Sequence, residues 1–299
     1  MLQKYDPRNE HIKVYVNGEI VHRNEAKVSV FDSVVQGGDA VWEGLRLYKQ
    51  GVLHLSAHLN RLRESAHAMA FTQIPTNEEV RSAIKQTLDA NGMTDETHLR
   101  LTLTRGEKVT SGMDPRLNQK GTCLIVLAEW KPLVYDNESG IKVITSAIRR
   151  NGPQFVDSKI HHNNLINNIL AKIQANHAGA DAAIMLDDRG FVSELNDTNV
   201  FIIKDHILYT PFADACLPGI SRGMVMDVAV KNSFSMHEKN LSLVDFYNAD
   251  FAFATGTMGQ LTPIVEADGR QIGNQEGRDY FSRVVKAYEA VIPYACEKL

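Results

Sequence analysis

The segment HIKVYVNGEIV, residues 11–21, most constrains the fold, because polar and apolar residues alternate on both sides of Asn17-Gly18. An Asn-Gly dipeptide between two alternating runs is the strongest short-range signal for a β-hairpin. The chain therefore begins with antiparallel pairing. Two later runs, THLRLTLTR at 97–105 and GTCLIVLAEW at 121–130, have the length and apolar content of further strands.

Two helices are predicted between the hairpin and those strands. The first follows Ser56, a candidate N-cap, because apolar residues recur there at helical spacing: Leu59, Leu62, Ala66 and Met69. The second begins near Thr76, has acids in its first turn and ends at Asn91-Gly92. Helices and strands together predict an α/β first half.

A stretch rich in turn-forming residues, KPLVYDNESG at 131–140, is the best candidate linker. We therefore predict a small N-terminal α/β domain at 1–130, an interdomain linker at 131–140 and a large domain at 141–299. The second half has predicted hairpin turns at 187–190 and 204–206, and helices from Ser221 and from about Gly277. Because strands dominate it, an α+β fold is favoured over a doubly wound parallel sheet.

Composition excludes several classes of function. The net charge is -4 and the basic residues are scattered, so no nucleic-acid partner is expected. The three cysteines, Cys123, Cys216 and Cys296, form no CxxC pair, so neither a disulfide framework nor a zinc site is expected. The N-terminus lacks a signal-peptide core and the apolar runs are too short to span a membrane, which predicts a cytoplasmic protein without membrane partners.

Lys159 is the first candidate for chemistry, in the stretch FVDSKIHHNNLINN. It precedes a predicted helix that we expect to pack through one apolar stripe, formed by Leu165, Ile166, Ile169, Leu170 and Ile173. An amine on the approach to a helix N-terminus has a lowered pKa or binds an anion. The alternative is an ordinary solvated lysine. Neighbouring His161 and His162 have no third ligand at suitable spacing, so no metal site is expected.

Three further features lie downstream. Glu194 ends one predicted strand, where a carboxylate can hold a protonated ring nitrogen, or simply face water at a sheet edge. Ser221 opens a helix after Pro218-Gly219, and its free amides suit a phosphate. Thr257 lies in a Thr-Gly-Thr turn with accessible amides suited to an anion. Each feature alone is weak.

Taken in order, these features resemble the class IV aminotransferases, the pyridoxal 5'-phosphate (PLP) enzymes of fold type IV. The resemblance covers nearly the whole chain. GGDAVWEGLRLY, residues 37–48, is similar to the family's Gly-x-x-x-Phe-Glu-Gly-x-Arg segment, and HLNRLRESA, residues 58–66, looks like its His-x-x-Arg-Leu helix. The implied fold is the two-domain, D-amino acid aminotransferase-like one.

The resemblance implies a role for each matching residue. Lys159 would form the Schiff base with PLP and shuttle the substrate proton, and Glu194 would pair with the pyridine nitrogen. Leu217 would pack on the ring. The phosphate would be held by Arg61, Ile220, Ser221 and Thr257. Periodicity alone disagrees for Arg61, because it falls on the face opposite the apolar residues and would be solvated.

The resemblance is closest to branched-chain amino acid aminotransferases, and it implies a substrate pocket formed by Trp42, Arg100, Met113, Arg150, Thr257 and Met258. Arg100 and Arg150 could equally be members of structural ion pairs. The loop ending at Gly112–Pro115, with Met113 at its tip, would reach the neighbouring subunit of a homodimer. Departures stand at His98 and Asn164, where that group usually has tyrosines, and at Gly37-Gly38.

The function implied is transfer of an amino group from an amino acid, best a branched-chain L-amino acid, to 2-oxoglutarate. D-amino acid or (R)-amine transamination and aminodeoxychorismate lyase activity are alternatives on the same fold. A non-catalytic PLP-binding regulatory protein is the alternative from another class, disfavoured by the presence of both Lys159 and Glu194.

Overall fold

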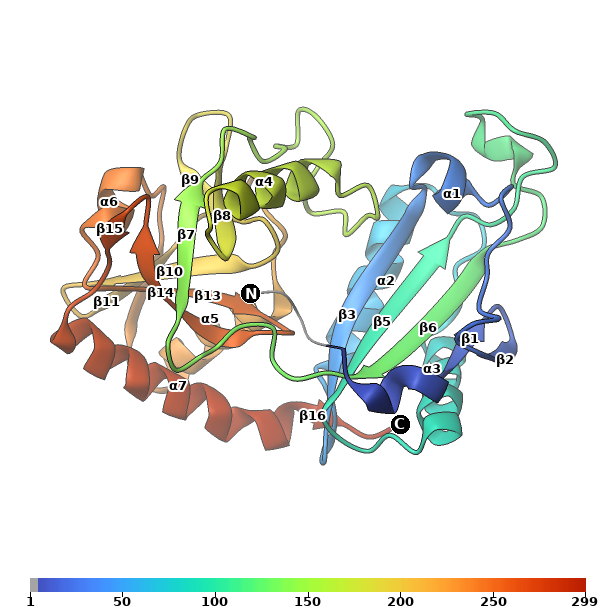
Figure 1. The fold of residues 1–299 in the computed structure, drawn as a ribbon, viewed down its shortest axis with the longest axis horizontal. Helices are drawn as coiled ribbons and strands as arrows, with labels where there is room; N and C mark the ends of the chain where they lie inside the picture. Colours follow the sequence, from blue (N-terminus) through green and yellow to red (C-terminus); the bar gives the residue numbers. More distant parts are fainter. Residues whose placement is uncertain (1–4) are drawn as a thin grey trace. The chain divides into compact units, whose positions relative to one another are not determined.

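The structure is a computed structural model that describes residues 5–299 (Figure 1). Its backbone divides into two compact units. The N-terminal unit runs to Pro132 and includes Ile160–Asn164 and Pro293–Leu299, whereas the C-terminal unit comprises Leu133–Lys159 and Leu165–Ile292. The change of unit at 132/133 lies within the segment predicted as linker. The return of two short, distant segments to the N-terminal unit was not predicted.

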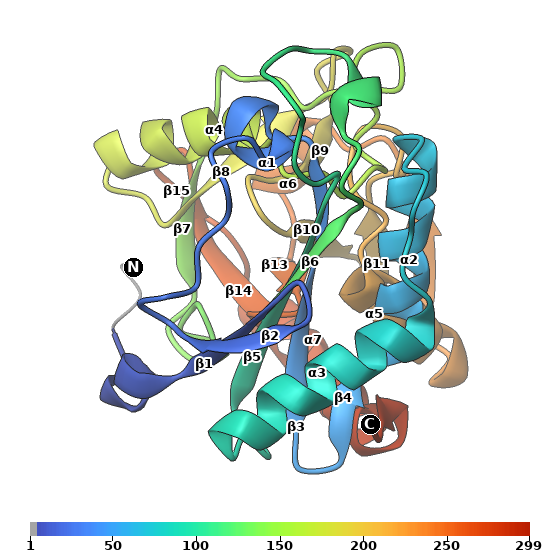
Figure 2. The same ribbon diagram turned by 90° about the vertical axis from the view of Figure 1, so that its right-hand side faces the viewer.

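The N-terminal unit is a seven-stranded sheet of order β16-β4-β3-β5-β6-β1-β2. Two helices, α2 (Leu55–Ala68) and α3 (Asn77–Asn91), pack on it (Figure 2). Its strands are β1 (Lys13–Val16), β2 (Glu19–His22), β3 (Ala40–Tyr48), β4 (Gly51–Leu53), β5 (Thr97–Thr104), β6 (Cys123–Trp130) and β16 (Cys296–Glu297), and short helical turns are η1 (Pro7–His11), α1 (Ser33–Gly37) and η2 (Pro115–Leu117). The predicted hairpin is confirmed, since β1 pairs with β2 across Asn17-Gly18.

Local signals predicted α3 well and α2 less well. Thr76 caps α3 in a reciprocal capping box with Glu79, and Gly92 ends the helix at φ 62°. Ser56, in contrast, is not the cap of α2. The N-cap is His54, which makes no side-chain capping bond. The amide and hydroxyl of Ser56 instead donate to the Glu297 carboxylate, at 2.8 and 2.6 Å, so a strand 241 residues away in sequence supplies the anion at this helix start.

The C-terminal unit is built on a nine-stranded sheet of order β12-β11-β10-β13-β14-β7-β8-β9, with β15 paired to β14. Antiparallel pairs predominate, and β7–β8, β7–β14 and β11–β12 are parallel. The strands are β7 (Ile141–Thr145), β8 (Ala182–Leu186), β9 (Val192–Leu195), β10 (Asn199–Lys204), β11 (Ile207–Thr210), β12 (Ser235–Glu238), β13 (Phe251–Gly256), β14 (Gln260–Ala267) and β15 (Arg270–Gln271).

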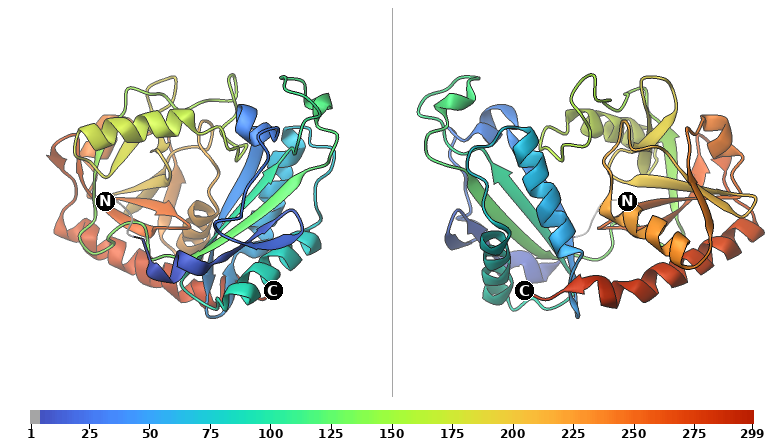
Figure 3. Two further views of the ribbon diagram at one scale, coloured as in Figure 1. Left: turned by 45° about the vertical axis from the view of Figure 1, so that its right-hand side comes forward. Right: turned by 180° about the vertical axis from the view of Figure 1, so that it is seen from behind.

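The helices of this unit are α4 (Ile166–His177), α5 (Ile220–Lys231), α6 (Leu243–Tyr247) and α7 (Gln275–Ala295), whose last residues enter the N-terminal unit. The helix α5 packs against β13 (Figure 3, orange). Phe281 of α7 contacts the rings of Phe251 and Phe253 on that same strand. The helix α7 therefore covers the face of β13 that carries Phe251 and Phe253.

The prediction that α4 packs through its large apolar stripe is wrong. Ile166, Ile169, Leu170 and Ile173 are 42–59% exposed. The helix packs instead through Ala171 and Ala175, both fully buried, against Ala183 and Met185 of β8. Small side chains let the helix lie close to the sheet, and the larger apolar residues consequently face outward. A search of residues 5–299 for a helix long and apolar enough to cross a membrane finds none.

We predict that Glu297→Ala destabilises the N-terminal unit by about 1 kcal/mol, the usual contribution of a helix-capping group. Burial alone would raise the pKa of Glu297, but its bonds from Ser56 and Arg81 outweigh burial and lower it. The loss is measured by urea unfolding. The control is Glu64→Ala on the exposed face of α2, and equal stability of the two variants would contradict the capping role.

Candidate active site

Lys159 lies in the long connection between β7 and α4. Its backbone amide donates to the Asp157 carboxylate at 3.0 Å, and its side chain is exposed. Among residues 5–299, nothing hydrogen-bonds or ion-pairs with its amine. The helix begins only at Ile166, and its N-cap residue Leu165 makes no side-chain capping bond. The predicted nucleophile is thus an unengaged amine at the end of the C-terminal unit's first segment.

Glu194 is buried in β9, only 4% exposed, and does not face water at a sheet edge. Arg150 donates its Nε to Oε1 at 2.5 Å, and Asn199 donates its Nδ2 to Oε2 at 3.2 Å. Burial raises the pKa of Glu194, while the positive charge of Arg150 opposes the rise. A carboxylate held in this way can remain ionised in an apolar setting only because its partners are fixed.

The ion pair with Glu194 explains why the Arg150 side chain is buried. Its side chain is 8% exposed and its Nε is engaged by Glu194. Of the two roles open to it from the sequence, the structure shows the ion pair. Its role toward a substrate carboxylate stays a prediction.

Three of the four predicted phosphate residues, Ile220, Ser221 and Thr257, lie at the start of α5 and just after β13, two elements that pack together. Gly219 is the N-cap of α5 and provides no side-chain capping bond. Ser221, in the first turn, is buried, and its hydroxyl has no hydrogen-bond partner in the described part of the chain. Two residues before Thr257, the buried Thr255 hydroxyl also lacks a partner among those residues. The uncapped amides and the Ser221 hydroxyl at the start of α5, and the unsatisfied Thr255 hydroxyl at the end of β13, are groups suited to a phosphate.

Leu217 and Met258 flank these groups through their backbones. The Leu217 carbonyl accepts from Asn199 at 2.9 Å, and the Met258 carbonyl accepts from the Val134 amide at 3.1 Å. The segment before α5 is also held by Ser193, whose hydroxyl donates to the Ala215 carbonyl at 2.8 Å. Strand β9 thus anchors the same segment that carries Leu217.

In the N-terminal unit, Arg61 is not solvated, contrary to the periodicity of α2. Its side chain is 12% exposed and binds both carboxylate oxygens of Glu43, at 2.7 Å each. Glu43 is fully buried and also contacts His58 at 2.6 Å and His161 at 3.0 Å. Helical periodicity could not reveal this, because the partner stands on β3. The predicted role of Arg61 toward phosphate stays a prediction.

Burial alone would raise the pKa of Glu43, but His161, Arg61 and His58 outweigh burial and hold its pKa well below the ordinary value. Burial lowers the pKa of His161, although Glu43 opposes this shift. The cluster is therefore an ionised carboxylate surrounded by donors, with Arg61 as its permanent cation.

Trp42 and Arg100 form a stacked pair beside this cluster. The Arg100 guanidinium lies 4.0 Å from the Trp42 ring centroid and donates to the Asn163 side chain at 3.0 Å. Trp42 also contacts His161, with ring centroids 4.1 Å apart. The residues that follow Lys159 thus pack onto β3 and β5, which explains why Ile160–Asn164 belongs to the N-terminal unit.

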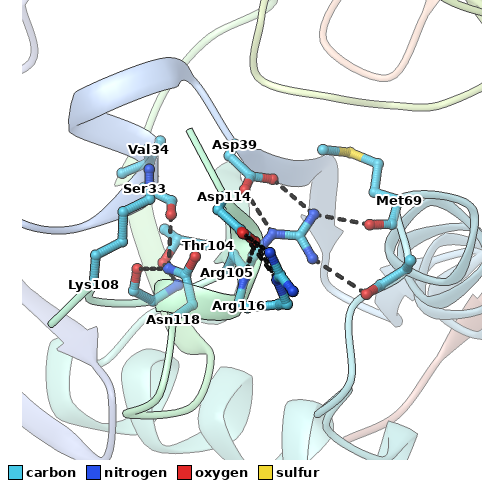
Figure 4. Close-up of polar contacts among 12 residues, drawn as sticks. Ser33, Val34, Asp39, Met69, Thr104, Arg105, Lys108, Asp114, Arg116 and Asn118 are labelled. Atoms are coloured by element: carbon cyan, nitrogen blue, oxygen red, sulfur yellow. Dashed lines mark hydrogen bonds and ion pairs between the residues drawn. The ribbon is translucent and has the colours of Figure 1, made fainter. Parts of the chain in front are cut away.

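Met113 is 90% exposed at the tip of the loop between β5 and β6. The loop is held at its base (Figure 4). Lys108 donates to the Gly112 carbonyl, Asn118 bridges Ser33 and the Gly106 carbonyl, and Arg105 pairs with Asp39.

No cluster of three or more His, Cys, Asp or Glu residues that could hold a metal occurs among residues 5–299.

Comparisons with known proteins show which family the chain is similar to. The family model "Amino-transferase class IV" matches residues 40–267. Branched-chain-amino-acid aminotransferase-like protein 2 of Arabidopsis thaliana is 56% identical over 95% of this chain and 51% of its own length. A putative branched-chain-amino-acid aminotransferase of Methanocaldococcus jannaschii is 39% identical, covering 89% of this chain and 91% of its own. The chain spans about half the length of the two Arabidopsis relatives.

Among solved structures, the branched-chain aminotransferase of the thermophilic archaeon Thermoproteus uzoniensis, crystallised with norvaline, has a TM-score of 0.86 at 29% identity. The match covers 95% of this chain and 96% of that one. The likeness confirms the predicted fold class.

We predict that Glu43→Gln costs about 3–5 kcal/mol at neutral pH, because it leaves Arg61 buried without its counter-charge. Since the folded pKa of Glu43 is depressed, this stabilisation is present above its unfolded value near 4.5 and is lost as pH falls through the folded value. Urea unfolding at several pH values measures it. The control is Glu107→Gln, whose partner Lys120 is exposed and whose loss costs under about 1 kcal/mol. A pH-independent difference between wild type and Glu43→Gln would contradict this account.

Proposed function

The chain belongs to the class IV aminotransferase family, and on this basis we propose that it is a PLP-dependent transaminase. We propose that it transfers the amino group of a branched-chain L-amino acid to 2-oxoglutarate. The observation that carries the proposal is the group in the C-terminal unit formed by buried Glu194, the uncapped start of α5 and the Ser221 hydroxyl, unpartnered within residues 5–299. The names of the relatives supply the substrate class.

The residues present fit PLP. The phosphate would meet the first amides of α5, at Ile220 and Ser221, and the turn at Thr257, where the described part of the chain leaves hydrogen-bonding groups without partners. Glu194 would hold a proton on the ring nitrogen, and Leu217 would pack against the ring. When bound, PLP supplies a carbonyl that takes up amines and a ring that withdraws electrons from the substrate α-carbon.

Lys159 would attach the cofactor and then act as the base. Its amine is unengaged within residues 5–299, so forming a covalent bond breaks no ion pair seen there. Released from that bond, the Nζ atom would take the proton from the substrate α-carbon and pass it to the carbon of PLP that carried the aldehyde. The buried ion pair with Arg150 would hold the Glu194 carboxylate in place to keep the ring nitrogen protonated.

We predict that Lys159→Ala abolishes both activity and the yellow absorption band of the wild-type protein loaded with PLP. The matched control is Lys231→Ala, an exposed lysine at the end of α5. Turnover is measured side by side with L-leucine, D-alanine, an (R)-arylamine and aminodeoxychorismate. A colourless wild type incubated with PLP would refute the cofactor, and turnover of any other donor but not L-leucine would refute the branched-chain substrate.

We also propose that the protein is a homodimer, because each unit exposes apolar side chains that a monomer would leave in water. In the C-terminal unit this is the outward face of α4, defined by Ile166, Ile169, Leu170 and Ile173. In the N-terminal unit it is formed by Val30, Phe31, Val35 and Met113, 48–90% exposed. Backbone hydrogen bonds join residues 31–33 to residues 106–108 at the base of the Met113 loop. A cytoplasmic location stays a prediction.

We predict that Ile169→Glu together with Ile173→Glu converts the dimer to a folded monomer, measured by sedimentation and circular dichroism. Placing two carboxylates in an apolar interface disfavours association without disturbing the alanine face through which α4 packs. The control is Val230→Glu, a lone apolar residue that is 75% exposed on α5. A double variant that remains dimeric would exclude the outward face of α4 from the interface.

A further inference from the structure

Asn199, the first residue of β10, connects two parts of the candidate cofactor site. It is 6% exposed. Its Nδ2 donates to Oε2 of Glu194 at 3.2 Å and to the carbonyl of Leu217 at 2.9 Å. One amide group thus bonds both the buried carboxylate of β9 and the segment that leads into α5.

The oxygen atom of the Asn199 carboxamide also has little free space around it. A Cβ atom added to Gly219 would lie 2.0 Å from the Asn199 Oδ1, so a side chain at this position collides with Asn199. Gly219 is the N-cap of α5. Because its φ is -63°, the glycine is required here by this close approach and not by backbone conformation.

Glu194 needs these donors. It has two oxygens in a buried position, one bonded to Arg150 and the other to Asn199. Without Asn199, the donors left to the Glu194 carboxylate are Arg150 and the Leu217 amide, so its charged form is less well stabilised. The pKa of Glu194 is already raised by burial, so loss of a donor moves it further toward the neutral acid.

We propose that Asn199 is a positioning residue that keeps Glu194 ionised and fixes it relative to the start of α5, so that the groups for the ring nitrogen and for the phosphate form one rigid assembly. This inference rests on the proposed function, because it concerns how the chain prepares for PLP.

The test replaces Asn199 by Asp and by Ala. The Asp variant keeps the shape but puts a second carboxylate oxygen beside Oε2, and two such oxygens share a proton. We expect the dissociation constant for PLP to rise roughly 10- to 100-fold in both variants, the range for a lost hydrogen bond to a charged group. The Asp variant should also show a spectral transition of bound PLP between about pH 5 and 9, in the range where a coupled buried pair titrates. The Ala variant should show a weaker transition of the same kind, because it also loses the donor to Glu194, and wild type should lack it.

Glycine variants of α5 provide an independent test with a matched control. Gly219→Ala should weaken PLP binding as Asn199→Ala does, because the new methyl group displaces the carboxamide. Gly223 lies one turn later in the same helix, and a Cβ there meets nothing within 4 Å, so Gly223→Ala should leave PLP affinity unchanged and maintain or raise stability.

The outcomes separate the two proposals. A wild type that binds no PLP refutes the proposed function. A wild type that binds PLP while both Asn199 variants bind it equally well, without a new pH transition, refutes the role of Asn199. A fall in melting temperature alone, with unchanged PLP affinity below that temperature, reduces Asn199 to a packing residue and equally overturns the inference.

Discussion

The buried ion pair between Arg150 and Glu194 is the interaction on which the candidate cofactor site of the C-terminal unit depends. Two charges removed from water stabilise a fold only if their geometry is fixed and their remaining lone pairs and N–H groups form hydrogen bonds. Pairing of β8 with β9 places Glu194 opposite Met185, and Arg150 follows β7, bonded through its amide to the Leu186 carbonyl. The sheet therefore aligns the guanidinium and the carboxylate before any ligand is considered.

The N-terminal unit also buries a carboxylate beside a fixed cation, but different elements supply the two groups. Glu43, in the middle of β3, is fully buried, and its counter-charge comes from α2, which packs on that strand. His161 reaches the same carboxylate from the segment just after Lys159. This short segment is bonded to β3 by its backbone as well, since the Trp42 amide donates to the His161 carbonyl at 2.9 Å. Because the segment after Lys159 is held at several points, the backbone next to the lysine is constrained. The Lys159 side chain is nevertheless exposed.

The sequence predicted those features whose determinants are close in the chain. The turn at Asn17-Gly18 and the capping box of Thr76 and Glu79 involve residues at most three apart. It did not predict that Glu297 would bind Ser56, that Glu43 would bury Arg61, or that α4 would pack through alanines. The first two depend on partners 241 and 18 residues away, and the third on the depth available over β8. Periodicity marks apolar faces but not which face the sheet accepts.

Two positions where the sequence differs from the pattern usual in branched-chain aminotransferases, His98 and Asn164, lie in the N-terminal unit. Burial lowers the pKa of His98 to about 3, so the ring is neutral, and its Nδ1 lies 3.2 Å from the Leu45 carbonyl, to which it donates. That nitrogen is satisfied within the sheet and does not stand in for a tyrosine hydroxyl. Asn164 packs beside Gly38. Arg100, two residues after His98 on the same strand, stacks on Trp42 as a cation on an aromatic face, and the role of this pair toward a substrate stays a prediction.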